Sequence, residues 1–216
     1  VNKRRDSTLG RIPELAKQRK LASRIRKYSI GNMSELLDEF RSNLELEGVS
    51  LHFAADAEAA RTTISSIARQ EGVESAVLAK SMLCEELEIE GQLEKSGVQV
   101  YQTDLGERIL QLGQDKPSHV TAPCLHWSAS EIGELATRTL GAAPTLDARE
   151  LSHAFAGDLR PRFFEAAMGV TGANIGIAST GTIVLVENEG NIRMVTSLPR
   201  ILVSVMGMEK VVSEEA

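Results

Sequence analysis

The chain has 216 residues, of which 42% are hydrophobic, 4% aromatic and 25% charged, and its formal net charge is −6. That length and apolar content suffice for a globular domain, whose core must be built from Ala, Val, Ile and Leu because aromatic residues are sparse. No apolar run approaches membrane-spanning length, the basic N-terminus lacks the apolar centre of a secretory signal, and the two cysteines lie far apart, so we expect a cytoplasmic protein without membrane insertion.

Positive charge is concentrated at the N-terminus. Residues 1–27 contain ten Lys or Arg against two Asp or Glu, whereas the remainder holds 14 basic and 28 acidic residues. We predict a basic, helical arm over residues 1–30 and a single α/β domain over residues 31–216. The arm is expected to rest on the acidic body of the chain or on a partner subunit. Nucleic-acid binding is not expected, because no aromatic residue that could stack on a base precedes Tyr28.

Helices and strands alternate after the arm. Asp56 is a predicted helix N-cap, and the pairs Ser128/Glu131 and Asp147/Glu150 have the spacing of capping boxes. With the apolar periodicity, these signals predict helices over 33–46, 56–72, 81–96 and 128–141 and from Asp147 onward, and strands over 49–53, 73–79 and 98–103. The β-α-β order predicts an α/β fold with a mostly parallel sheet flanked by helices.

From Thr171 onward the predicted elements are closely spaced strands. Strands are expected over 175–178, 183–186 and 192–196, and a polar connection over 187–191 joins the last two. Hydroxyl, amide and glycine residues bracket the first of these strands, and glycines let a ligand approach backbone amides. We therefore predict a ligand-binding site that includes Thr171, Gly172, Asn174, Thr180, Gly181 and Thr182.

A second part of this site follows the strand over 73–79. In parallel sheets ligands gather beyond the carboxyl ends of the strands, which is where Lys80 and Ser81 lie. A lysine beside hydroxyl groups can hold a phosphate or a carboxylate. The alternative is that Lys80 is a solvated cation and Ser81 only caps the next helix. Glu85 and Glu86 either face Lys80 or favour the N-terminal dipole of that helix.

The glycine-rich segment also carries a family resemblance. The sequence GVTGANIGIASTGTIVLVENEGN, followed by VTSLP and VMGMEK, resembles the LUD domain of the bacterial lactate-utilization B family. Matching segments at 80–86, TDLGE at 103–107 and PSHVTAP at 117–123 extend the resemblance over nearly the whole chain, from about Tyr28 to Val212. It implies an electron-transfer component of an L-lactate oxidation complex, with other lactate-utilization subunits as partners. It also implies an α/β architecture similar to the sugar-isomerase and CoA-transferase superfamily.

The chain departs from the family pattern in two places. Ser179 stands where a glutamate is expected, which removes a carboxylate from the turn before Thr180. The family continues into a ferredoxin-like domain with cysteine runs, whereas this chain has only Cys84 and Cys124, and an iron–sulfur cluster needs four thiolates or equivalents. We expect no cofactor in this chain, with iron–sulfur clusters only in a missing C-terminal domain. The chain is either a fragment of a longer protein or a short natural paralogue.

Glu189 is a candidate catalytic residue in the connection over 187–191. In enzymes similar to class I CoA transferases, a glutamate beside glycine and asparagine is a nucleophile that forms an acyl-CoA thioester. The alternatives are a non-covalent ligand contact and an ordinary hairpin turn with positive φ at Asn188 or Gly190. The catalytic residues are otherwise unknown, and the predicted ligand-binding set is completed by Asn188, Glu189, Gly190, Asn191 and Arg193.

The histidines match no metal-site motif, so no metal site is predicted. No Ser–His–Asp set has a local signature such as G-x-S-x-G, and the G-x-G-x-x-G fingerprint is absent, so no nicotinamide cofactor is expected. Three functions stay open. The first is a lactate-utilization component whose LUD domain supplies a pocket or docking face. The second is a self-contained enzyme or binder of CoA thioesters, sugar phosphates or small organic acids that uses Lys80 and Glu189. The third is a non-catalytic subunit with a vestigial pocket.

Overall fold

The computed structural model describes residues 2–119 and 122–214, and these form two compact units. The N-terminal unit consists of the described parts of residues 1–51, 174–184 and 207–216, and the central unit consists of those in 52–173 and 185–206. The predicted single domain over residues 31–216 therefore contains parts of both units. Among the described residues, no helix combines the length and the apolar character that crossing a membrane requires.

A four-stranded parallel sheet forms the middle of the central unit, with strand order β2-β1-β3-β6. This confirms the predicted α/β class. The apolar runs pair in register, with Val77 of β1 beside both Tyr101 and Gly169. The strands are β1 (Ser75–Leu78), β2 (Gln99–Gln102), β3 (Met168–Gly172) and β6 (Ile201–Val205).

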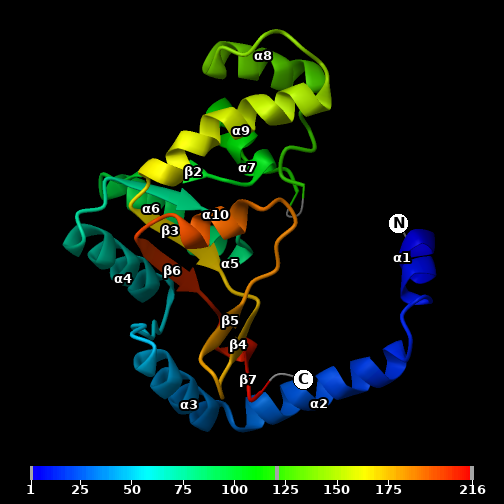
Figure 1. The fold of residues 1–216 in the computed structure, drawn as a ribbon, viewed down its shortest axis with the longest axis vertical. Helices are drawn as coiled ribbons and strands as arrows, with labels where there is room; N and C mark the ends of the chain where they lie inside the picture. The colour runs from blue at the N-terminus through cyan, green and yellow to red at the C-terminus, as the bar shows by residue number, and fades with distance from the viewer. Residues whose placement is uncertain (1, 120–121, 215–216) are drawn as a thin grey trace. The chain divides into compact units, whose positions relative to one another are not determined.

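Helices cover both faces of this sheet (Figure 1). Successive strand residues point to opposite faces, so Ala76 and Leu78 pack with α4 and α6 while Val77 packs with α9 and α10. Both faces are therefore buried, which is the usual condition of a parallel sheet. The helices of this unit are α4 (Ala57–Gln70), α5 (Met82–Glu86), α6 (Ile89–Lys95), α7 (Leu105–Gly113), α8 (Ala129–Leu140), α9 (Ala148–Glu165) and α10 (Asn191–Ser197).

The predicted helix starts are confirmed. Asp56 accepts the amide hydrogen of Ala59, and Ser128 and Glu131 form a reciprocal capping box at α8. Asp147 caps α9 by accepting two backbone amide hydrogens. The capping box there is incomplete, because the Glu150 side chain accepts from the Thr145 hydroxyl and not from the Asp147 amide. These contacts are local in sequence, which is why they could be predicted.

Two predicted strands are wrong, and one predicted helix is divided in two. Residues 49–53 form no strand, because the amide of Val49 closes the end of the preceding helix by bonding to the Leu44 carbonyl. The helix predicted over 81–96 is divided into α5 and α6 at Glu88, whose φ is 52°, and the break lets α6 bury its apolar side chains on the sheet. Residues 192–196 belong to helix α10, and helix α7 was not predicted from the sequence.

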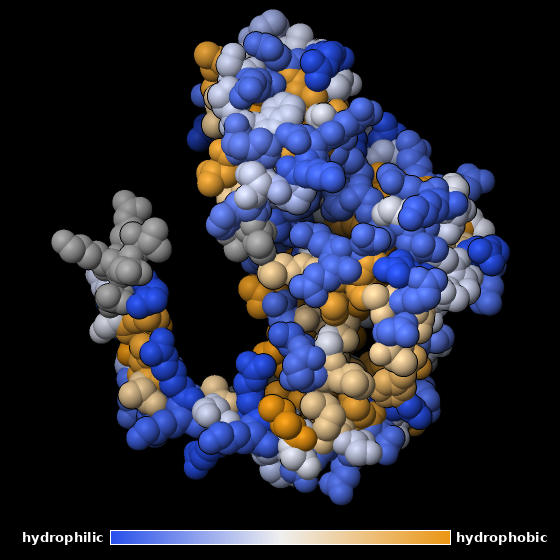
Figure 2. Space-filling view, turned by 180° about the vertical axis from the view of Figure 1, so that it is seen from behind, coloured by the Kyte–Doolittle hydropathy of each residue, from blue (hydrophilic) through white to orange (hydrophobic). Residues whose placement is uncertain are grey.

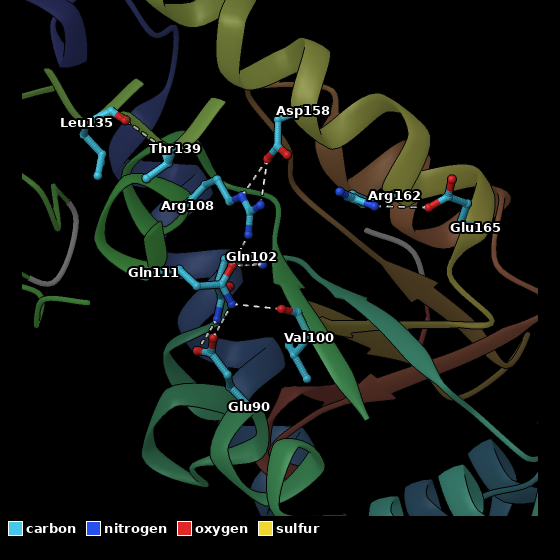
Figure 3. Close-up of polar contacts among 10 residues, drawn as sticks. All are labelled: Glu90, Val100, Gln102, Arg108, Gln111, Leu135, Thr139, Asp158, Arg162 and Glu165. Carbon is cyan, nitrogen blue, oxygen red and sulfur yellow. Dashed lines mark hydrogen bonds and ion pairs between the residues drawn. The ribbon is translucent and has the colours of Figure 1, made fainter. Parts of the chain in front are cut away.

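The outer edge of β2 is closed by a side chain. The amide group of Gln111 accepts from the Gln102 N–H at 3.1 Å and donates to the Val100 carbonyl at 3.0 Å, as a neighbouring strand would (Figure 3). Arg108 holds Gln111 in place by donating to its oxygen at 2.6 Å, and donates twice to Asp158 at 2.9 and 2.7 Å. This network ties β2 to α7 and α9, and it protects an edge that could otherwise pair with another chain.

The described part of the N-terminal unit contains three α-helices, one short 3-10 helix and a small sheet of order β5-β4-β7. Helix α3 packs on β7, and the Asn43 amide donates to the Ala178 carbonyl at 2.8 Å. Helix α2 carries no acidic residue and buries only Ser29, and its surface in Figure 2 is largely hydrophilic. The elements are α1 (Asn2–Leu9), α2 (Leu15–Gly31), α3 (Met33–Leu46), β4 (Ile175–Ile177), β5 (Thr182–Val184), η1 (Met208–Lys210) and β7 (Val211–Val212).

Candidate functional site

Polar residues meet beyond the carboxyl ends of the central strands. Lys80 follows β1, and its Nζ lies 2.9 Å from Oε1 of Glu107 in the first turn of α7. The two side chains are only 21% and 11% exposed, so Lys80 is a largely buried, paired cation and not a solvated one. We call the group formed by Lys80, Glu85, Asp104, Glu107 and Glu189 the carboxyl-edge cluster.

Ser81 occupies the turn between β1 and α5. Its hydroxyl accepts the amide hydrogen of Cys84 at 3.3 Å, so Ser81 caps α5, as the alternative to a ligand-binding role states. Gly172 at the end of β3 lies so close that a Cβ atom there would collide with Ser81 Oγ. Thr171 beside it is buried, and its hydroxyl donates to the Gly172 carbonyl at 3.0 Å. Because β3 packs this closely against Ser81, position 172 has no room for a side chain, which explains why it is glycine.

Glu189 reaches the same edge from the connection before α10. Its Oε2 accepts the Leu105 N–H at 3.3 Å, at the start of α7. Partial removal from water, the charge of Asp104 and a hydrogen bond with its carboxyl group raise the pKa of Glu189. Asp104 is itself held in place, because it caps α7 by accepting the Glu107 amide hydrogen at 3.2 Å.

The carboxyl-edge cluster contains more carboxyl groups than cationic groups. Partial burial and the charge of Glu107 also raise the pKa of Glu85. Four carboxyl groups thus share one ammonium group, that of Lys80. A ligand phosphate or carboxylate must compete with Glu107 for Lys80, whereas protons, hydroxyl groups and amines find acceptors here.

The remaining residues of the connection support its shape. The Asn191 amide donates to Thr103 Oγ1 at 3.2 Å, and Gly190 has a φ of 78°, as expected for a glycine that precedes a helix. Glu187 accepts the backbone N–H of Arg193 at 3.0 Å and pairs with its guanidinium at 2.8 Å. The Arg193 guanidinium is therefore already paired with a carboxylate next to the start of α10. Asn188 is exposed to solvent. The hairpin alternative for Glu189 is wrong in its second strand, since the connection leads into α10, but the positive φ that it placed at Asn188 or Gly190 is found at Gly190.

Four predicted site residues belong to the N-terminal unit instead. Thr180 and Thr182 share a hydroxyl–hydroxyl bond of 2.8 Å in the β4–β5 turn, and Asn174 donates its backbone N–H to Val184. Gly181 has a φ of 67°, and its backbone passes so near α3 that a Cβ atom would lie 3.1 Å from Asn43 and Leu44. These residues shape a hairpin within their own unit, and a shared site with Lys80 stays a prediction.

Thr103, Asp104 and Glu107 are site residues that the sequence motifs did not reveal. They lie directly after β2 in the TDLGE segment, and the signal that could have revealed them is their position at the end of a strand next to β1.

Burial raises the pKa of both cysteine thiols, so neither is poised as a thiolate. In the part of the chain that the structure describes, no group of three His, Cys, Asp or Glu side chains has metal-binding geometry.

Glu189→Gln is expected to stabilise the protein slightly at pH 8. Because the folded-state pKa of Glu189 is raised above its ordinary value of 4.5, ionisation costs folding free energy as the pH rises through the folded-state pKa. The neutral amide removes that cost, which is about 0.5 kcal/mol for a solvent-screened carboxylate. Urea denaturation at pH 8 and pH 4 measures it, with the exposed Glu86→Gln of α5 as the control. An equal gain at both pH values would contradict the assignment.

These features define a class, an α/β protein with helices on both faces of a parallel sheet and a charged cluster beyond the strand ends. Residues 37–216 match the LUD domain, and the chain belongs to the LUD domain family.

The chain is also similar to curated relatives. It is 40% identical to lactate utilization protein B 1 of Bacillus mycoides over 195 residues. This alignment covers 90% of this chain and 41% of that protein. It is 40% identical over 194 residues to lactate utilization protein B of Oceanobacillus iheyensis and 37% identical over 194 residues to that of Bacillus cereus, with the same coverage of 90% and 41%. The chain thus spans about two fifths of the length of these relatives. No solved structure matches it.

Proposed function

We propose that this chain is the LUD domain of a protein that acts in L-lactate utilization, as a component of an electron-transfer complex that oxidises lactate to pyruvate. The observation that carries the proposal is about 40% identity over 90% of the chain to proteins named lactate utilization protein B. Other subunits of such a complex are the proposed partners.

In this proposal the domain supplies a small-ligand pocket or a docking face at the carboxyl-edge cluster. The Lys80 and Glu107 side chains are largely buried there, and the exposed Glu189 lies beside them with a raised pKa. We place the iron–sulfur clusters in a part of the full-length protein outside this chain, because the chain has two cysteines and a cluster needs four thiolates or equivalents.

The test is growth of the source organism on L-lactate after deletion of the full-length gene. The deletion strain is expected to grow on pyruvate and to fail on L-lactate, and the full-length gene is expected to restore growth. Normal growth on L-lactate in a strain without a paralogue would overturn the proposal. The anaerobically purified full-length protein should contain iron and acid-labile sulfide, and its lack of both would remove the electron-transfer role.

A second candidate is a self-contained enzyme or binder of CoA thioesters, sugar phosphates or small organic acids. The specific observation in its favour is that Lys80 pairs with Glu107 in the first turn of α7 while Glu189 accepts the Leu105 N–H at the start of the same helix. Acetyl-CoA, glucose 6-phosphate and L-lactate at millimolar concentration then distinguish the ligand classes by thermal stabilisation, which binding to the folded state must produce. Stabilisation that Lys80→Gln abolishes would favour this candidate, and no stabilisation by any of the three counts against it.

A further inference from the structure

A serine, a histidine and an aspartate meet on the segment between α7 and α8. Oγ of Ser118 lies 2.7 Å from Nδ1 of His126, and Nε2 of the same ring lies 2.8 Å from Oδ2 of Asp115. The imidazole thus bridges a hydroxyl and a carboxylate, as in the serine triads of unrelated folds, but with its two nitrogens exchanged, since in those triads Nε2 faces the serine and Nδ1 faces the carboxylate. We call Asp115, Ser118 and His126 the loop triad.

The loop triad is anchored to α7 by Trp127. The indole Nε1 donates to Asp115 Oδ2 at 2.9 Å, and the ring packs so closely on Gly113 that a Cβ atom there would lie 2.7 Å from it. The Lys116 amide donates to the other oxygen of Asp115 at 2.8 Å. The carboxylate is therefore fixed by a side chain and a backbone group besides His126, as an orienting group must be.

The protonation states suit the chemistry. Hydrogen bonds from His126, Trp127 and the Lys116 amide lower the pKa of Asp115 from 3.8 to about 2, so the group is ionised at neutral pH. A carboxylate can only accept, so Nε2 of His126 must donate its N–H to Asp115, and in that tautomer Nδ1 is the nitrogen that accepts from Ser118. The serine hydroxyl has a second acceptor, the Pro123 carbonyl at 3.2 Å, but the contact with His126 is shorter.

We propose that Ser118 is a nucleophile that accepts acyl groups from activated esters and thioesters, with His126 as general base and Asp115 as the residue that positions it. This activity goes beyond the proposed role in lactate utilization and does not depend on the carboxyl-edge cluster. The side chains of His126 and Asp115 are 37% and 43% exposed, so an acyl donor reaches the loop triad from solvent.

The reaction balances with the residues present and water. Ser118 Oγ attacks the carbonyl carbon while its proton passes to Nδ1 of His126, and Asp115 stabilises the imidazolium. The tetrahedral adduct expels an alcohol or a thiol, which takes the proton back from His126, and leaves an acyl ester on Ser118. Water, deprotonated by His126, then cleaves this ester to a carboxylic acid and restores the serine.

The test uses the full-length protein, a fluorophosphonate probe and p-nitrophenyl acetate. The probe is expected to label Ser118, located by peptide mass spectrometry, and p-nitrophenyl acetate is expected to be hydrolysed. Ser118→Ala should abolish labelling, and His126→Gln should slow both reactions about 100-fold, the usual contribution of a general base. Ser130→Ala changes an exposed serine of α8 whose hydroxyl donates to Glu134 of the same helix, and it should leave both rates unchanged.

Two outcomes overturn the proposal. If the wild-type protein is not labelled at Ser118, the hydrogen bonds of the loop triad only stabilise the conformation of the segment between α7 and α8. If His126→Gln is labelled as fast as the wild type, the serine is not activated by the imidazole. Either result leaves the lactate proposal untouched, since growth on L-lactate tests that role separately.

Discussion

Arg108→Met is expected to lower the free energy of unfolding by about 3–5 kcal/mol, the usual cost of removing one partner of a buried ion pair. The Arg108 and Asp158 side chains are only 7% and 13% exposed, and two hydrogen bonds of 2.9 and 2.7 Å join them. Methionine fills much of the volume but leaves the Asp158 carboxylate without its cation and removes a donor from Gln111. Urea denaturation followed by circular dichroism measures the loss.

Arg193→Met is the matched control for this prediction. Arg193 also pairs with a carboxylate, that of Glu187 at 2.8 Å, but its side chain is 80% exposed. Exposed pairs contribute about 1 kcal/mol or less, so the two variants should differ severalfold. The double variant Arg108→Met/Asp158→Asn should recover part of the loss, because it removes the unpaired charge. Equal small effects of Arg108→Met and Arg193→Met would show that Asp158 is hydrated.

Gly169→Ala is expected to destabilise the protein by about 3 kcal/mol or more, at the upper end of overpacking effects. Gly169 lies in the middle of β3, and a Cβ atom there would collide with the backbone carbonyl of Val195 in α10. Val195 is fully buried on that face of the sheet, and a backbone atom cannot turn away as a side chain can. The expected result is a lower urea midpoint, together with partial loss of α10 from the sheet.

Gly157→Ala in α9 is the control for the same substitution in open space. No heavy atom lies within 4 Å of the Cβ position at Gly157, which is an exposed residue inside the helix. Alanine there should stabilise the protein by about 0.5–1 kcal/mol, since glycine weakens a helix interior. A stability of Gly169→Ala within about 1 kcal/mol of the wild type would mean that α10 packs less closely on β3 than the structure shows.

Much of the central unit could be predicted from the sequence, because its signals are local. The apolar runs that became β1 and β2 alternate with capped helices, and this order is enough to indicate a parallel sheet. Asp56, Ser81 and Ser128 lie three residues before the amides that they cap, so their role does not depend on the rest of the fold.

The failures occur where distant residues decide the local conformation. Ile192–Thr196 has the composition of a strand. A helix forms because Glu187 accepts the Arg193 N–H in the first turn of α10 and because Val195 packs against Gly169. The break at Glu88 likewise depends on the burial of Ile89 and Leu93 on the sheet. Short apolar segments are compatible with either structure, and tertiary packing overrides their propensity.

The candidate site divides in the same way. The sequence by itself determined that Lys80 and Ser81 follow a buried strand and that Glu189 lies in a polar, glycine-containing connection, because position along the chain fixes both. Only the tertiary structure decided that Lys80 pairs with Glu107 and that Glu189 bonds to the start of α7. It also placed Thr180 and Gly181 in the other unit and joined Ser118, His126 and Asp115 into the loop triad. Hydrogen bonds and ion pairs between side chains need atoms within about 3 Å of each other, and no spacing in these segments specifies that distance before the chain has folded.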